Sequence, residues 1–177
     1  MGTPESSSVA EAVPAGDQPA APERRFVTVV FADLVGFTTF SESRDPEDVR
    51  AMLTAYFDRS RAIVERYSGE VDKFIGDALM AVWGAVAAHE DDAERATRAA
   101  LDLVDMVAEL GEEIGVPGLR LRAGALSGET SVGPGGNEKG LVVGDIVNTA
   151  SRLQSLAEPG SVYVGAPTFD LVNHVVE

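Results

Sequence analysis

The hydrophobic positions near the start of this chain form first a continuous run and then a helical stripe. Residues 26–33 read FVTVVFAD, a β-branched and aromatic run that predicts a buried strand ending at Asp33. After Asp45, which is suited to capping a helix, Pro46 fits the first helical position and apolar side chains recur every three or four residues. We therefore expect a strand followed by an amphipathic helix, with Gly69 as the helix stop.

The next segments predict a hairpin, a second helix and a further strand. The runs EVDKFIG and DALMAVWG meet at Gly76 and Asp77, which leaves room only for a tight turn. Residues 89–113 begin with acidic side chains and then place apolar residues at helical spacing, whereas residues 119–129 alternate as a strand does. Predicted after them are a flexible excursion over 131–140, a helix over 144–158, a strand over 161–165 and a last helical piece over 167–175. This order predicts an α+β fold with a ferredoxin-like β-α-β-β-α-β core and C-terminal additions.

The first 22 residues differ in composition from the rest of the chain. They contain no aromatic and no basic residue and are rich in Pro, Ala and Ser. Such a segment buries too little apolar surface to offset the entropy of ordering it, so we expect residues 1–22 to be a disordered leader. A single folded domain is then expected over 23–177.

Composition narrows the chemistry and the partners. The chain has no cysteine and two histidines, which excludes a thiol nucleophile and a zinc–thiolate site and disfavours a histidine-built metal site. A formal net charge of −15 argues against nucleic acid or an anionic membrane surface as the main partner. No stretch approaches about 18 unbroken apolar residues and no signal peptide is visible, so we expect a cytoplasmic protein without a membrane segment.

The carboxylates of Asp33 and Asp77 are the first candidates for chemistry. An unpaired charge at the end of a buried strand is costly, and the predicted fold brings the hairpin turn beside that strand end. Two carboxylates repel unless divalent cations lie between them, and Mg²⁺ binds a few carboxylates together with waters and substrate phosphates. Either aspartate alone is commonplace at a strand end or in a turn, so the pair is the more specific signal.

Two further groups of residues are suited to binding a phosphorylated ligand. Gly36 lets the backbone approach a ligand closely, and the amides of Phe37 and Thr38 that follow are suited to a triphosphate. Asn148 and Arg152 lie four apart on a predicted helix, roughly 6 Å from each other, where an arginine could hold an anion bidentately. The alternative for this second group is a surface arginine with an asparagine near the helix start.

Four ordered motifs resemble the catalytic domain of class III nucleotidyl cyclases, the adenylyl and guanylyl cyclases. They are VTVVFADLVGFTTFSE, GEVDKFIGDALMAVWG, RLRAGALSGE and GDIVNTASRLQ, and the resemblance runs from about Arg25 to the C-terminus. It is strongest to bacterial cyclase domains that precede other modules, so further regulatory domains beyond this chain are expected. The resemblance implies an adenylyl cyclase that converts ATP to cyclic AMP and pyrophosphate. It also implies two Mg²⁺ or Mn²⁺ ions per site and a head-to-tail homodimer whose two sites are shared between chains.

The resemblance assigns roles to individual residues. Asp33 and Asp77 match the metal-binding aspartates, with the Leu34 carbonyl assisting one ion. Lys73 matches the adenine-reading lysine of the family. Its ammonium can donate to N1 of adenine, whereas guanine carries a hydrogen there and guanylyl cyclases typically have an acid at this position.

The remaining matches concern the ribose and the phosphates. Asn148 and Arg152 match the pair that orients the ribose and stabilises the α-phosphate in the transition state. Arg122 matches a phosphate-contacting arginine. In the family's geometry, the aspartates come from one chain and Lys73, Asn148 and Arg152 from the other.

The sequence departs from the family at the second base-reading position, seven residues before Asn148. Adenylyl cyclases usually carry Asp or Thr there, and this chain has Leu141, which cannot accept a hydrogen bond from the adenine amino group. Base discrimination is therefore expected to rest on Lys73. Asp145 lies only three residues before Asn148 and is expected to cap the helix instead. From the resemblance, we also expect the family's last strands, where some members carry another phosphate-binding lysine, to be absent from this sequence.

Two other functions are consistent with parts of the pattern. One is a catalytically idle cyclase-homology module that dimerises or senses nucleotide for a partner domain; Leu141 and the short C-terminus favour it, and the retained Asp33, Asp77, Asn148 and Arg152 oppose it. The other is a diguanylate cyclase, which has the same core topology. Its hairpin requires Gly-Gly-Asp/Glu-Glu-Phe, and KFIGDALM does not contain that motif.

Overall fold

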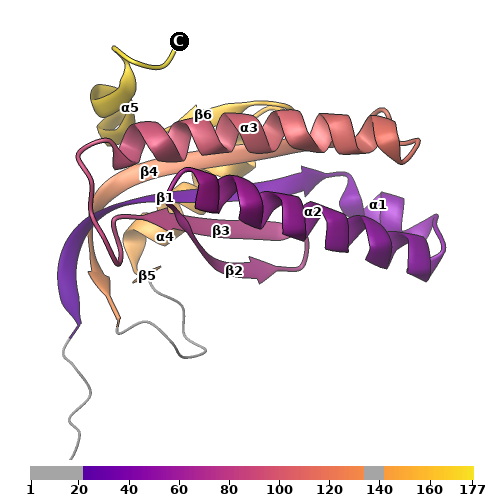
Figure 1. Cartoon of the computed structure of the whole chain (residues 1–177), viewed down its shortest axis with the longest axis horizontal. Helices are drawn as coiled ribbons and strands as arrows, with labels where there is room; N and C mark the ends of the chain where they lie inside the picture. Colours follow the sequence, from indigo (N-terminus) through magenta and orange to yellow (C-terminus); the bar gives the residue numbers. More distant parts are fainter. Residues whose placement is uncertain (1–21, 134–141) are drawn as a thin grey trace, which may run out of the picture.

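A mixed sheet forms the centre of the molecule in the computed structural model, which describes residues 22–133 and 142–177 (Figure 1). The strands are β1 (Glu23–Val35), β2 (Glu70–Ile75), β3 (Ala78–Trp83), β4 (Arg120–Val132), β5 (Val142–Val143) and β6 (Val162–Val164). The helices are α1 (Phe37–Glu42), α2 (Pro46–Arg66), α3 (Asp92–Glu113), α4 (Asp145–Leu156) and α5 (Ala166–Val172). All but one residue of the predicted leader, and 134–140 of the predicted excursion, lie outside the described residues.

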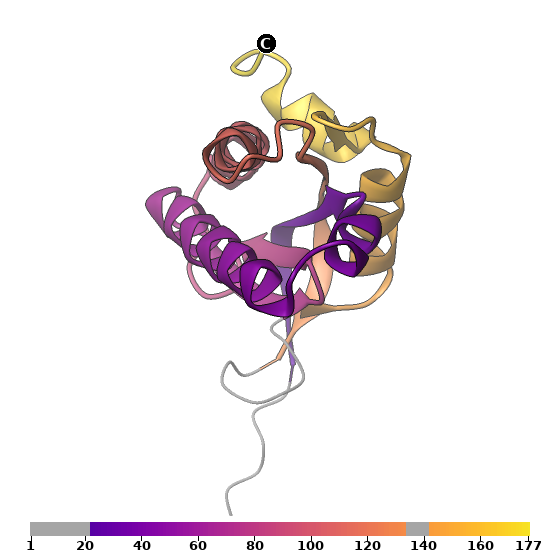
Figure 2. The ribbon, with the colours of Figure 1, turned by 90° about the vertical axis from the view of Figure 1, so that its right-hand side faces the viewer.

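The sheet topology confirms the predicted α+β class and the ferredoxin-like core. The strands are ordered β2-β3-β1-β4-β5, and β6 pairs with β4 in parallel. Strand β1 is antiparallel to both β3 and β4, as the core requires. Figure 2 shows α2 and α3 on one side of the sheet and α4 on the other. The segment from β5 to α5 is the C-terminal addition to the core.

Both faces of the sheet are covered, so the central strand buries side chains of either orientation. Along β1, Val30 and Ala32 belong to a core packed against α2 and α3. Val29 and Phe31 belong to a second core, packed against α4. This two-sided burial explains why residues 26–33 read as a continuous apolar run.

The start of α2 is as predicted, but its end is not. The Asp45 side chain accepts a hydrogen bond from the Glu47 backbone N–H at 2.9 Å, which caps the helix. After the last turn it is Ser68, not Gly69, that takes the left-handed conformation, with a φ of 62°. Gly69 has a different reason to be glycine, because a Cβ there would overlap the ring of Trp83.

Three other details differ from the sequence prediction. The helix start expected after Gly36 is the short helix α1, whereas β5 was not predicted. Strand β4 is longer than expected and includes Ser131 and Val132 of the predicted excursion. The expected cap at Asp145 is wrong: Gly144 is the N-cap, no side chain caps α4, and Asp145 is the first residue within the helix.

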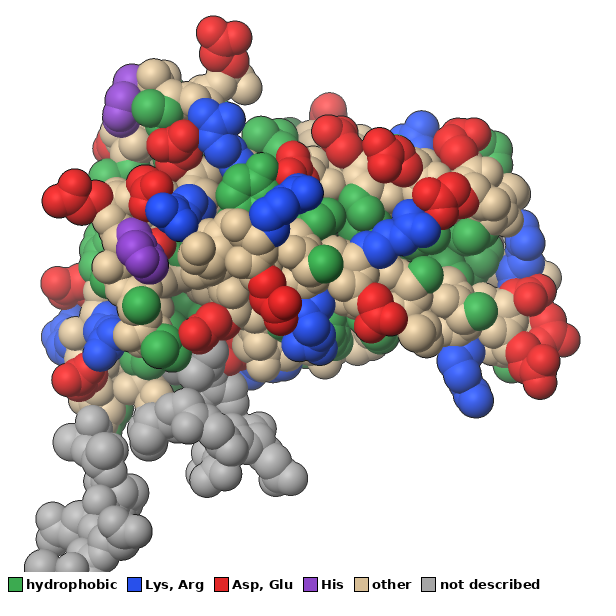
Figure 3. Space-filling view, viewed as in Figure 1, with side chains coloured by type: hydrophobic (Ala, Val, Ile, Leu, Met, Phe, Trp, Pro, Cys, Tyr) green, Lys and Arg blue, Asp and Glu red, His purple; other side chains and the backbone are tan. Residues whose placement is uncertain are grey.

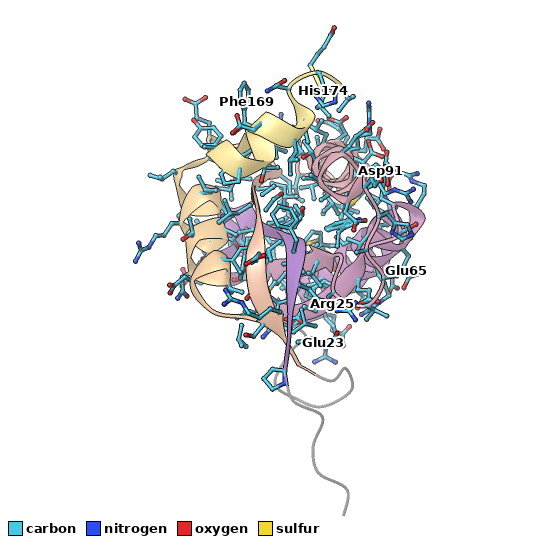
Figure 4. All side chains as sticks on the ribbon, turned by 90° about the vertical axis from the view of Figure 1, so that its left-hand side faces the viewer. Glu23, Arg25, Glu65, Asp91, Phe169 and His174 are labelled. Atoms are coloured by element: carbon cyan, nitrogen blue, oxygen red, sulfur yellow. The ribbon has the colours of Figure 1, made fainter. Side chains whose placement is uncertain are left out.

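Charged side chains of both signs are mixed on the face formed by α2 and α3 (Figure 3). One ion pair joins the two helices between Arg59 and Glu113, with an N–O distance of 2.6 Å. At the end of the sheet where β1 begins, the Arg25 guanidinium donates hydrogen bonds to the Glu23 carboxylate and to the Val86 carbonyl. Figure 4 labels Arg25 and Glu23 at this end. None of the described helices has both the length and the apolar character needed to cross a membrane.

Candidate active site

The two candidate carboxylates meet where β1 ends beside the hairpin turn. Asp33 lies near the C-terminal end of β1, and Asp77 lies in the turn between β2 and β3. The antiparallel register pairs Ala32 with Leu79, which brings the turn next to Asp33. The two side chains are close enough to share a hydrogen bond. The juxtaposition expected from the topology is therefore present.

Burial and the neighbouring Asp77 raise the pKa of the Asp33 carboxyl group. Its pKa is raised from the ordinary value of 3.8 to about 6, firstly by burial and then by the hydrogen bond and charge of Asp77. The Arg122 charge and the Leu34 backbone act in the opposite direction, with smaller effect. The pair therefore has negative charge that the protein itself only partly neutralises.

Oxygen ligands of this kind are suited to a cation that brings other ligands with it. The described residues contain no group of three or more His, Asp or Glu side chains that could hold a metal ion by themselves. Asp33 and Asp77 supply two carboxylates, and Leu34, the next residue of β1, has a backbone carbonyl. Mg²⁺ commonly completes such a partial set with waters and substrate phosphates. The donor set thus fits a hard divalent cation bound together with a phosphorylated ligand.

A buried tyrosine from α2 lies close to the two carboxylates. Tyr56 is fully buried, and the pKa of its hydroxyl is raised above the usual range by burial and then by the charges of Asp77 and Asp33. Tyr56 belongs to the apolar stripe that the sequence predicts for this helix, and its proximity to the carboxylates was not predicted. The sequence signal that could have indicated it is the tyrosine hydroxyl, a polar group within the otherwise apolar stripe of α2.

Arg122 connects the carboxylates to α4. It is the direct cross-strand partner of Asp33, and its Nη2 atom lies 3.8 Å from Asp33 Oδ2. Its Nη1 atom donates to the Ser155 carbonyl of α4 at 3.3 Å. The guanidinium therefore lies at the edge of the candidate site, within reach of a phosphate bound there.

The turn after β1 leads into backbone amides near the carboxylates. Gly36 has a φ of 74°, a conformation that glycine adopts without strain, and a side chain there would meet no atom within 4 Å. Phe37 and Thr38 are the first residues of α1, where N–H groups have no partner within the helix. These two amides, four and five residues after Asp33, therefore have no partner within the helix.

Lys73 lies on β2, on the strand that leads into the Asp77 turn. Its side chain is 37% exposed, and Nζ lies 3.3 Å from Asp72 Oδ2. The sequence prediction identified Lys73 and did not consider Asp72, although the acid lies directly before it in the chain.

Asn148 and Arg152 are not joined to the carboxylates by any hydrogen bond or ion pair among the described residues. Both are exposed, one turn apart on α4. One chain therefore presents two separate sets of candidate residues.

Leu141 lies outside the described residues. The two residues that follow it form β5, and the Val143 carbonyl accepts a hydrogen bond from the Thr130 hydroxyl at 2.8 Å. The Val143 carbonyl, two residues after Leu141, therefore already accepts a hydrogen bond from β4.

Comparison with known sequences identifies a shared catalytic domain. The model of the adenylate and guanylate cyclase catalytic domain matches residues 20–176. The chain is 38% identical over 139 residues to adenylate cyclase 1 of Rhizobium meliloti (strain 1021), covering 75% of this chain and 21% of that protein. It is 32% identical over 152 residues to an adenylate cyclase of Mycobacterium tuberculosis (strain CDC 1551 / Oshkosh), covering 81% and 34%. The chain thus spans about a fifth to a third of the length of these relatives.

Solved structures of both adenylyl and guanylyl cyclases are similar to this fold. The adenylyl cyclase CyaB from P. aeruginosa has a TM-score of 0.82 at 29% identity, covering 88% of this chain and 84% of that one. The guanylyl cyclase Cya2 has a TM-score of 0.79 at 30% identity, covering 85% and 80%. The guanylate cyclase domain of RhGC from Catenaria anguillulae, in complex with GTP, has a TM-score of 0.75 at 30% identity, covering 85% and 84%.

Proposed function

The chain belongs to the adenylate and guanylate cyclase catalytic domain family, and we propose that it converts ATP into 3′,5′-cyclic AMP and pyrophosphate. In this reaction the ribose 3′-hydroxyl attacks the α-phosphorus in line with the departing pyrophosphate. Two sites form between two copies of the chain. At each site, one copy supplies Asp33 and Asp77 and the other supplies Asn148 and Arg152. The similar proteins include cyclases of both nucleotides, so the choice of ATP is part of the proposal.

Asp33 and Asp77 hold two Mg²⁺ or Mn²⁺ ions, with the Leu34 carbonyl as a further ligand. When bound, two such ions lower the pKa of the attacking hydroxyl and neutralise the leaving phosphates. The raised pKa of Asp33 supports this role, because burial and then the neighbouring Asp77 disfavour its charge, which a bound cation would stabilise. The net charge of −15 is compatible with ATP for the same reason, since the nucleotide arrives as its metal complex.

The triphosphate lies along the turn after β1. The amides of Phe37 and Thr38 donate to its oxygens, and Arg122 contributes a guanidinium from the neighbouring strand. Because Arg122 lies 3.8 Å from Asp33, its guanidinium would be within reach of a phosphate bound at the carboxylates.

Asn148 and Arg152 act on this site from the second chain. They are exposed on α4, and no hydrogen bond or ion pair among the described residues joins them to Asp33 or Asp77, which supports a role across an interface. Asn148 orients the ribose, and Arg152 stabilises the charge that builds up on the α-phosphate in the transition state. Loss of Arg152 therefore lowers turnover more than binding.

Lys73 selects the base. An ammonium donates a hydrogen bond to N1 of adenine and has no acceptor at N1 of guanine, which carries a hydrogen. Because Leu141 offers no hydrogen bond, the preference for ATP over GTP depends on this one side chain.

The observation that carries the proposal is the pair of Asp33 and Asp77, held together at one end of the sheet within a cyclase fold. The test is incubation of the purified chain with Mn²⁺ and either ATP or GTP, with chromatographic detection of the cyclic nucleotide. We expect cyclic AMP from ATP and its loss on chelation of Mn²⁺. Nucleotide binding without any cyclic product would contradict the proposal and favour an idle, nucleotide-sensing module.

A further inference from the structure

The ion pair between Asp72 and Lys73 joins neighbours in the sequence. In a regular β-strand, successive side chains point to opposite faces of the sheet, so their charged ends are far apart. Here Lys73 Nζ lies 3.3 Å from Asp72 Oδ2. The strand must therefore be irregular at this point.

The irregularity is a β-bulge with Asp72 as the extra residue. Across the hairpin, Val71 pairs with Ala81 and Lys73 pairs with Met80. Two steps along β2 thus match one step along β3. Bulges of this kind commonly redirect a side chain near a functional site.

The bulge decides which face of the sheet receives the lysine. Val71 and Phe74 both pack on the core beneath α2 and α3. Without an extra residue, Lys73 would share the face of Val71, two positions away, and its charge would enter that core. With the bulge, Lys73 lies on the face of its partner Met80, which belongs to the core covered by α4.

Burial makes the pair asymmetric. The Asp72 side chain is 0% exposed, whereas that of Lys73 is 37% exposed. A buried carboxylate has few positions available, while a lysine has many rotamers whose ordering opposes binding. The fixed carboxylate therefore restricts the ammonium before any ligand arrives, and restriction of this kind favours binding.

We propose that Asp72 is a positioning residue that holds the Lys73 ammonium on the α4 face of the sheet, in the orientation that reads the purine base. This inference rests on the base-reading role of Lys73 in the proposed function. It adds that selectivity for ATP depends on a second side chain, which does not touch the nucleotide.

The first test measures equilibrium binding of 3′-deoxy-ATP and 3′-deoxy-GTP with Mn²⁺ by calorimetry, because these nucleotides lack the attacking hydroxyl. Asp72→Asn keeps the side-chain shape and removes its charge. We expect the ratio of 3′-deoxy-ATP to 3′-deoxy-GTP affinity to fall about three- to tenfold, with unchanged affinity for inorganic triphosphate, which has no base. Asp58→Asn is the control, since it removes an exposed carboxylate of α2, and it should keep the ratio.

A double-mutant cycle separates positioning from a general structural role. Lys73→Met should lower the same ratio, and adding Asp72→Asn to Lys73→Met should change it no further. An additional fall in the double variant would show that Asp72 acts on the base by another route and would overturn the inference.

A measurement on the wild-type protein covers the case in which Asp72→Asn does not fold. Lys73 and Lys139 are the chain's two lysines, so the ¹⁵N side-chain spectrum contains two ammonium signals, assigned with Lys73→Met. We expect the Lys73 ammonium to be rigid before nucleotide is added. A Lys73 ammonium as mobile as a free lysine side chain would overturn the inference.

The outcomes also separate this inference from the proposed function. If the wild-type protein prefers 3′-deoxy-ATP and Asp72→Asn keeps that preference, the inference alone is wrong. If the preference falls as expected but ATP yields no cyclic product, the proposed reaction is wrong and the inference holds. A wild-type protein that binds both nucleotides equally, or neither, contradicts the base-reading role and with it the inference.

Discussion

Arg122 and Asp33 face each other directly across β4 and β1, yet their charged atoms remain 3.8 Å apart. That separation exceeds the length of a hydrogen bond, so the arginine neutralises the carboxylate only in part. Asp77 shares a hydrogen bond with the same carboxylate and raises its pKa further. The negative charge of the two aspartates is therefore only partly neutralised within the chain, which is the basis of the first two predictions below.

Removal of either aspartate should abolish cyclase activity. Asp33→Ala and Asp77→Ala each remove a proposed ligand of the divalent ions, and we expect a loss of at least about a hundredfold in kcat with Mn²⁺. Asp58→Ala, at an exposed position of α2, is the control and should retain activity. Near wild-type rates in either active-site variant would contradict the assignment of metal ligands.

The carboxylate pair should lower the stability of the metal-free protein above about pH 6. The folded-state pKa of Asp33 is about 6 and its ordinary value is 3.8, so the folded state binds more protons between these values. Stability therefore falls as pH rises through this window. Because Asp33 is partly exposed to solvent, we expect Asp33→Asn to be more stable than the wild type by about 1 kcal/mol at pH 7.5.

The measurement is urea unfolding of the wild type and Asp33→Asn in chelator, at several pH values. The difference between the two proteins should shrink as pH is lowered toward 4. A constant difference across this range would show that the Asp33 pKa is not raised in the folded protein.

Gly69 should be intolerant of a side chain although its backbone is not left-handed. A Cβ at Gly69 would overlap the Trp83 ring, so Gly69→Ala should cost about 1–3 kcal/mol of unfolding free energy. Gly118→Ala is the control, because a Cβ there meets no atom within 4 Å, and its effect should stay within about 0.5 kcal/mol. Urea midpoints measure both, and equal values for the two variants would contradict the packing account.

Leu141 should weaken discrimination between the bases. A hydrogen bond that reads a base is worth about 1–3 kcal/mol, so a site with Lys73 as its one reader should prefer ATP by a margin about ten- to a hundredfold smaller than a two-reader site. Leu141→Asp should therefore raise the ATP/GTP ratio of kcat/KM. An unchanged or lower ratio would favour a backbone carbonyl near Val142 or Val143 as the second reader.

Much of the fold could be predicted because hydrophobic period and helix-start chemistry are local. The strand that ends near Asp33, the α2 cap at Asp45 and the hairpin at Gly76 all follow from short stretches of sequence. The reason for a glycine at position 69 could not be predicted, because it is the close approach of the Trp83 ring, which is adjacent only in the folded chain.

The same distinction applies to the candidate site. The meeting of Asp33 with Asp77 followed from the topology, since one strand end and one turn share an edge. The proximity of Tyr56 required the packing of α2 on the sheet. The bulge at Asp72 required the register of β2 against β3, which alternation along a single strand does not reveal.

The central claim is that two chains share each active site. Asp33 and Asp77 lie together, whereas Asn148 and Arg152 are exposed on α4, and no hydrogen bond or ion pair in the described residues joins them to the aspartates. In a head-to-tail dimer, a chain without its metal-binding aspartate and a chain without its transition-state arginine still complete one intact site between them. Each variant alone completes none.

The most direct measurement is therefore cyclic AMP formation by a mixture of Asp33→Ala and Arg152→Ala, with heterodimers verified by differently tagged chains. Each variant alone should be inactive. The account predicts that the mixture regains activity, up to one working site per heterodimer. Verified heterodimers without recovered activity would contradict a site shared between the two chains.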